Sequence, residues 1–184
     1  FFGIKAFNTV ADALVGQNDF VNSTQAGAGV NRYYGIYINS SALTTVDNKF
    51  TNMYRAVDIT GNGGAVTVQK SEITYTQQSY FDVFPIRVTD VTQSPVLIEG
   101  NDLNYSATAT NNNNQAGMFF DNARNLVVIG NTVNGFAQGI RVQGGSRFTE
   151  IVQNNVLNAD RFGILVAGGR NHNIEGNYLE GMAN

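Results

Sequence analysis

Pairs of carboxylates are the first residues of this chain that could do chemistry. Glu72 and Asp102 occupy equivalent places in neighbouring copies of a repeat, and Asp58 and Asp121 form a second pair, two copies apart. Two carboxyl groups hydrolyse a glycosidic bond when they lie about 5–5.5 Å apart, with retention, or about 6.5–9.5 Å apart, with inversion. We expect Glu72 and Asp102 to lie at a workable distance and the other pair, at roughly 10 Å or more, to be marginal. The alternative is a solvated, charged strand face that also carries Lys49.

A second possible chemistry is β-elimination, or epimerisation at carbon 5, of a uronic acid. Both reactions need a group that neutralises the substrate carboxylate and a base that removes the carbon-5 proton. Arg87 and Arg141 could neutralise the carboxylate, and Lys49 or Tyr37 could act as the base. The candidate catalytic residues are therefore Asp58, Arg87 and Lys49. The alternative for the first two is an ion pair between Asp58 and Arg87 on the surface.

We expect no cofactor and no metal site. The chain has no cysteine, and its single histidine, His172, lies in a predicted turn. One histidine cannot build a histidine-based metal site. The Gly-Gly-x-Gly-x-Asp repeat that binds calcium in some repeat proteins is absent, so Ca²⁺ is possible but not indicated.

A repeat in the sequence must position these residues. Asn131, Asn154 and Asn177 are 23 residues apart, and the segments Gly139-Ile140-Arg141-Val142 and Gly163-Ile164-Leu165-Val166 recur in step with them. Apolar and polar residues alternate around these marks, for example in Ile129-Gly130-Asn131-Thr132-Val133, where we predict that Ile129 and Val133 point inward. Two short alternating runs in each period predict a solenoid of stacked strands.

Both marks run through nearly the whole chain. The asparagine mark recurs at Asn18, Asn48, Ser71, Asn101, Asn131, Asn154 and Asn177, and the Gly-Ile-type mark begins at Gly3, Gly35, Ala56, Pro85, Gly117, Gly139 and Gly163. We predict an all-β solenoid of about seven rungs, 21–32 residues each, with parallel strands about 4.8 Å apart in successive rungs. The asparagines are expected to be structural, each bonding to the next in a column.

With these segments the chain resembles the right-handed parallel β-helix, or pectate-lyase-like, superfamily. The resemblance rests on the repeated Gly-Ile-x-Val and Ile-x-Gly-Asn-x-Val segments and covers residues 3 to about 180. It implies the fold, and a function among those of the superfamily: polysaccharide lyases, hydrolases and epimerases, phage tailspikes and surface adhesins. The Asn-Thr-Asp, Asp-Asp, Gly-His-Gly and Arg-Ile-Lys signatures of polygalacturonase-like members and the Asp-Pro-His-Glu motif of mannuronan epimerases are absent.

Three rungs are longer than the others, and their additional residues fall at one corner, in segments 22–34, 75–84 and 105–116. Insertions on a solenoid gather on one face, which is often the binding face. Aromatic rings in and beside these segments would suit sugar rings or a protein partner. The predicted substrate-binding residues are Tyr33, Tyr34, Tyr37, Tyr80, Phe119 and Arg141. The alternative is that the rings fold back and cover the wall of the solenoid.

The repeat also predicts two columns of side chains that point outward from the stack. The middle residues of the Gly-Ile strands should form one column: Lys5, Tyr37, Asp58, Arg87, Phe119, Arg141 and Leu165. Arg124, Arg147 and Arg170 are 23 residues apart and should share a corner. Three stacked guanidinium groups repel one another unless they meet turn carbonyls, an acid such as Asp121, or an anionic glycan or partner.

Composition limits the partners. Charged residues make up 14% of the 184-residue chain, and its net charge of −3 argues against nucleic acid as the main partner. No apolar run is long enough to span a membrane. We expect residues 1–184 to form a single β-helix domain, and a section of a longer β-helix, because both ends fall within a rung.

Two functions from different classes remain open. The first is an extracellular or virion-surface β-helix that binds polysaccharide on the face walled by the insertions, with or without processing it. The second is a structural shaft or adhesin segment without catalysis, located in a fibre, filament or trimeric spike, that stacks on other copies or on further rungs. The expected location is extracellular, on a cell surface or on a virion surface.

Overall fold

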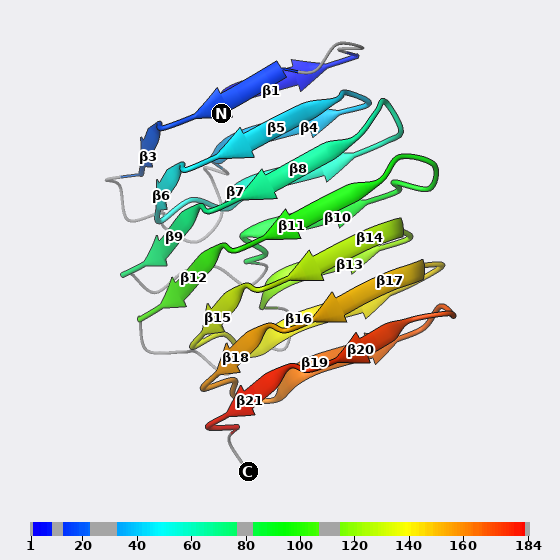
Figure 1. Ribbon diagram of the computed structural model, residues 1–184. Helices are drawn as coiled ribbons and strands as arrows, with labels where there is room; N and C mark the ends of the chain where they lie inside the picture. The colour runs from blue at the N-terminus through cyan, green and yellow to red at the C-terminus, as the bar shows by residue number, and fades with distance from the viewer. Residues whose placement is uncertain (1, 9–12, 23–32, 77–82, 107–114, 183–184) are drawn as a thin grey trace.

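The chain coils into a stack of rungs (Figure 1). The computed structural model describes residues 2–8, 13–22, 33–76, 83–106 and 115–182. Across these residues it forms 21 strands and no helix, so no helix able to cross a membrane is found in them. The strands make three parallel sheets of seven strands each, and successive strands along the chain belong to the first, second and third sheet in turn. This is the predicted right-handed parallel β-helix of seven rungs.

The first sheet contains β1 (Phe2–Phe7), β4 (Tyr34–Asn39), β7 (Arg55–Thr60), β10 (Ile86–Thr89), β13 (Ala116–Asp121), β16 (Gln138–Gln143) and β19 (Phe162–Ala167). The second sheet contains β2 (Ala13–Gly16), β5 (Leu43–Val46), β8 (Val66–Gln69), β11 (Val96–Glu99), β14 (Arg124–Ile129), β17 (Arg147–Val152) and β20 (Asn173–Glu175). The third sheet contains β3 (Asp19–Val21), β6 (Lys49–Thr51), β9 (Glu72–Tyr75), β12 (Asp102–Tyr105), β15 (Thr132–Asn134), β18 (Asn155–Leu157) and β21 (Tyr178–Glu180).

Each rung has three strands, where the sequence pattern indicated two apolar runs. The run from Ile129 to Val133 is not one strand, because Gly130 adopts a left-handed conformation, with φ +64°, and bends the chain between β14 and β15. Ile129 is therefore half-buried at the outward end of β14, and Val128 points inward instead. Our prediction that Ile129 points inward is wrong for this reason, whereas Val133 is buried as expected.

The asparagine column forms an internal ladder. The Nδ2 of Asn101 donates to Oδ1 of Asn131 at 2.9 Å, and Asn131 and Asn154 repeat this bond to the next rung at 2.9 and 3.0 Å. Each of the three also donates to a backbone carbonyl of the rung before it, such as that of Val68 from Asn101. These side chains thus satisfy the backbone at the bend between the second and third sheets, which is the structural role predicted for them.

Two glycines of the Gly-Ile mark, on the first sheet, lie directly against side chains of the third sheet. A Cβ atom added to Gly139 would lie 2.2 Å from Cγ1 of Val156, and one added to Gly35 would lie 2.5 Å from Cε1 of Phe50. Both partners point inward from the third sheet. Any side chain at these two positions would displace side chains of the core. Glycine recurs in the mark because the packing leaves no room there for a Cβ atom.

The three longest connections join the third sheet to the first, as predicted. They fall between β3 and β4, between β9 and β10, and between β12 and β13. The turn between the first and second sheets also varies in length. It is shortest between β13 and β14, at residues 122–123, and longest between β10 and β11, at residues 90–95. Two rings at the corner between the third and first sheets point inward. Tyr75 and Tyr105 are buried and pack on each other, with ring centroids 5.8 Å apart. Both cover the core and neither is available to a ligand.

Candidate functional site

The outer face of the first sheet brings the predicted site residues into one column. Parallel register aligns Tyr37 with Asp58, Asp58 with Arg87, Arg87 with Phe119, and Phe119 with Arg141. The strand order places these residues on β4, β7, β10, β13 and β16, which are consecutive in the sheet. Adjacent members are therefore about 4.8 Å apart along the stack at the backbone.

Asp58 and Arg87 form a bidentate ion pair at the centre of this column. The Nε and one terminal nitrogen of Arg87 donate to the two carboxylate oxygens of Asp58, each at 2.8 Å. Asp58 is 0% exposed, although it is on the outward side of its strand. Burial alone would lower the pKa of Arg87, but the hydrogen-bonded carboxylate more than offsets this and raises it. Both oxygens of Asp58 are thus occupied and shielded, and its main effect is to fix the guanidinium of Arg87.

Arg55 is near enough to this pair for the charges of Arg87 and Asp58 to affect it, and sequence reasoning missed it. Its guanidinium lies 4.0 Å from the ring centre of Tyr54 and 4.7 Å from that of Phe84, and one of its nitrogens donates to the Tyr54 hydroxyl at 3.0 Å. Only 3% of Arg55 is exposed, and this burial lowers its pKa. Arg55 pairs in register with Tyr34, so the repeat places it on the outer face, but the repeat does not show which ring will cover it.

An aromatic platform occupies the first two rungs of the same face. We define it as Phe2, Phe7, Tyr34 and Tyr37. The ring of Phe2 stacks on that of Tyr34 at 4.9 Å and lies 5.2 Å from that of Tyr37. The ammonium of Lys5 lies 5.4–6.0 Å from the rings of Phe2, Phe7 and Tyr37. Phe2 and Phe7 are 47% and 58% exposed, so flat apolar surface faces solvent here.

The platform continues into the ion pair. Tyr34 lies edge-on to Tyr54, with ring centres 5.8 Å apart. Its pKa is raised by burial and, next, by the negative charge of Asp58. Aromatic surface on rungs one and two is therefore separated from Arg87, on rung four, by the single rung that carries Asp58.

Beyond Arg87 the face is more closed. The ring of Phe84 stacks on Phe119 at 4.3 Å, which leaves Phe119 only 8% exposed. The guanidinium of Arg141 lies 5.5 Å from the centre of the Phe119 ring and remains half-buried. For Phe119 the structure therefore has the wall-covering arrangement that we gave as the alternative. Tyr33 is half-buried against the core, and Tyr80 lies outside the described residues.

The third sheet carries the other carboxylates. Glu72 and Asp102 are aligned on adjacent strands, as predicted. Lys49, on the other side of Glu72, forms an ion pair with it at 3.4 Å, with both side chains well exposed. Burial, and then the charge of Glu72, raise the pKa of Asp102. These residues form the solvated, charged strand face that was our alternative to a hydrolytic pair.

A family model described as a right handed beta helix region matches residues 35–184. The chain belongs to this family. No curated protein and no solved structure matches the chain.

The described part of this β-helix holds no cluster of three or more His, Cys, Asp or Glu side chains that would suit a metal ion. His172 lies in the turn after β19, where its Nε2 is 3.2 Å from the carbonyl oxygen of Gly168. Of the side chains predicted to act, the β-helix brings Tyr34, Tyr37 and Arg87 together on one face, and it places Lys49 on another.

Proposed function

We propose that this β-helix binds a polysaccharide on the outer face of its first sheet. The observation that carries the proposal is the aromatic platform, in which exposed rings surround the Lys5 ammonium. Large exposed apolar surface is uncommon on a soluble protein and marks an interaction site. Rings with a polar neighbour suit a sugar, which offers a C–H face to the ring and hydroxyl groups to the charge.

The parallel register supports a linear ligand. Successive rungs present side chains about 4.8 Å apart, so a chain lying along the stack meets one outward residue from each rung. From the platform it would reach Arg87 and then Arg141. Arg87 is held in one orientation by Asp58, which reduces the entropy lost when it binds a ligand group.

Binding, rather than turnover, is the activity that the geometry supports best. The carboxylate of Asp58 is buried and fully bonded to Arg87, so it offers no free oxygen to a substrate. Processing of the bound glycan is a more specific hypothesis, and a turnover assay run beside the binding measurement tests it. A polysaccharide ligand also motivates the proposed location outside the cell, on a cell surface or on a virion.

A glycan-array screen, followed by titration calorimetry on the hits, tests the proposal. Tyr37→Ala should weaken binding about 3- to 10-fold, because one stacked ring contributes about 0.5–1.5 kcal/mol. Tyr178→Ala is the matched control, since Tyr178 is 55% exposed but lies on the third sheet. Equal losses in the two variants, or the absence of any glycan hit, would overturn the proposal. Release of unsaturated or reducing ends from a glycan that binds would show that the protein also processes it.

A structural shaft is the alternative function, and one observation favours it. Val166, Ile174 and Leu179 occupy positions whose partners in the preceding rung are fully buried, yet they are 37%, 45% and 47% exposed. A further rung or a second copy stacked on β19, β20 and β21 would bury them. Sedimentation of the protein with and without Leu179→Lys tests this, because a stacked assembly should dissociate in the variant. A monomer in both cases would exclude self-stacking.

A further inference from the structure

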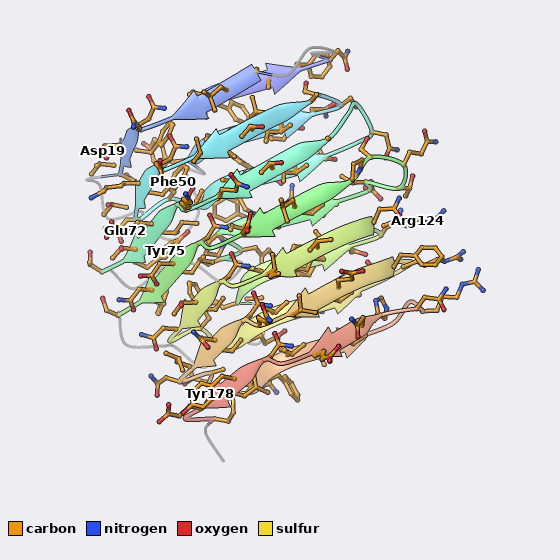
Figure 2. All side chains as sticks on the ribbon, in the orientation of Figure 1. Asp19, Phe50, Glu72, Tyr75, Arg124 and Tyr178 are labelled. Carbon is orange, nitrogen blue, oxygen red and sulfur yellow. The ribbon has the colours of Figure 1, made fainter. Side chains whose placement is uncertain are left out.

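The predicted column of arginines forms a stripe at the turn between the first and second sheets. Arg124 and Arg147 begin β14 and β17 and pair in register, and a parallel bridge joins Arg147 to Arg170. We call these three residues the arginine stripe. Figure 2 shows Arg124 at this outer edge, on the side of the stack away from Asp19 and Glu72. The stripe is thus separate from the third sheet and from its carboxylates.

The charge of the stripe is not balanced by neighbouring acids. In the described part of the chain, no carboxylate lies within 4.0 Å of a nitrogen of these arginines. The two aspartates of the adjacent turns are engaged elsewhere: Asp121 accepts from Gln143 at 2.8 Å, and Asp90 accepts from Asn122 at 2.9 Å. The pKa of Arg147 is lowered, first by the charge of Arg170, then by desolvation and Arg124. The stripe therefore offers three like charges to an external anion.

The backbone beside the stripe is strained in a repeated way. The residue after each arginine has a left-handed conformation, with φ of 53° at Asn125, 54° at Phe148 and 59° at Asn171. Asparagine tolerates this region, but a bulky phenylalanine there is a real outlier. Phe148 is also 54% exposed, so the fold gains little burial from it. Backbone strain that is retained at an exposed ring indicates that the ring has a role other than stabilising the fold.

We propose that the arginine stripe and Phe148 form a binding site for a linear acidic polysaccharide, one that carries carboxylate or sulfate groups. The guanidinium forks would bind the acidic groups, and the exposed ring would stack on a sugar between them. A chain lying along the axis would meet one arginine from each of three rungs. The site does not depend on the aromatic platform.

Nucleic acid fits these observations less well. A nucleic-acid-binding domain is typically strongly basic, whereas this chain has a net charge of −3. A local basic stripe on an acidic protein suits a ligand of lower charge density, with uncharged sugar surface between its acidic groups.

Binding of four polymers to the intact chain tests the site. Polygalacturonate supplies carboxylates, heparin supplies sulfates, dextran is the neutral control and a single-stranded oligonucleotide is the competing polyanion. We expect one acidic glycan to bind, more weakly as salt rises, and Arg147→Gln to reduce its affinity about tenfold. Lys70→Gln removes the same charge from an exposed position on another turn and should have no effect.

Phe148→Asn separates ligand binding from folding. Asparagine matches Asn125 and Asn171 and relieves the left-handed strain, so thermal stability should be kept or rise while affinity for the acidic glycan falls several-fold. Tyr178→Ala removes an exposed ring from the third sheet and should leave this binding intact. Equal affinity of Arg147→Gln and Lys70→Gln, equal binding of dextran, or tighter binding of the oligonucleotide would each overturn the proposal.

Discussion

The Nδ2 of Asn48 donates to the hydroxyl oxygen of Thr45 at 2.8 Å, within its own rung. Asn101, Asn131 and Asn154 instead donate this hydrogen bond to the next asparagine of the ladder. The rung after Asn48 has Ser71 at the ladder position, which is too short to accept it. Thr45 is 0% exposed and pairs with Val15 and Val68 in a column of inward residues. A buried threonine thus replaces the acceptor that the serine cannot supply.

Restoring the ladder should make Thr45 unnecessary. Ser71→Asn combined with Thr45→Val should raise the free energy of unfolding by about 1–2 kcal/mol, because the amide chain becomes continuous and the core column becomes apolar. Thr45→Val alone should lose about 1 kcal/mol. Chemical denaturation of both single variants and the double variant gives the coupling. Purely additive effects would mean that the two positions are independent.

Thr149 carries a buried hydroxyl that has no hydrogen-bond partner among the described residues. It is 0% exposed on the inward side of β17, where its neighbour in the preceding rung is Leu126. Thr149→Val keeps the shape and removes the unsatisfied group, so we expect a gain of about 1 kcal/mol in the free energy of unfolding. Thr67→Val, on the outward side of β8, is the control and should change little. A loss of stability in Thr149→Val would show that the hydroxyl is satisfied in solution.

Removing Arg87 should be costly because it leaves Asp58 charged and buried. Arg87→Met should lower the free energy of unfolding by about 3–5 kcal/mol, and Asp58→Leu in the same chain should recover much of this. Arg141→Met is the control, since Arg141 lies over Phe119 and forms no ion pair with a described residue. Thermal or urea unfolding measures all three. A loss in Arg87→Met no larger than in the control would mean that the Asp58 carboxylate does not depend on Arg87 for its stability in the fold.

The raised pKa of Asp102 makes stability depend on pH. The folded state binds this proton more tightly than the unfolded chain, so its contribution to stability is present below the ordinary value of 3.8 and is lost as the pH rises through the raised pKa. Asp102→Asn should therefore stabilise the fold at neutral pH and have no such effect at about pH 3. Glu175→Gln, at an exposed position on β20, is the control. An equal effect at both pH values would contradict the assignment.

The repeat predicts the fold because each rung repeats the same few constraints. Gly139 marks the contact between sheets, Asn131 marks the bend, and the distance between marks locates the longer connections. The columns on the first sheet follow from the same register, so Tyr37, Asp58 and Arg87 could be aligned before the structure was known.

Exposure could not be predicted in the same way. An outward position on a strand is exposed only if nothing folds over it, and the residues that cover the first sheet come from outside its strands. Phe84 precedes β10 and closes over Phe119, and Tyr54 precedes β7 and holds Arg55. The residue types at these two places change from rung to rung, so the repeat does not predict a covering ring there. The compensation of Ser71 by Thr45 escaped prediction for the same reason, because it occurs in a single rung.

The length variation of the chain has a geometric consequence. The longest connections leave the third sheet and return to the first, and the strands on either side keep the register of the shorter rungs. Each rung raises the stack by about 4.8 Å, whatever number of residues it contains. Physical height is therefore counted in turns of the coil and not in amino acids. Residues can be inserted or deleted at the corner between the third and first sheets while the distance between any two rungs stays constant.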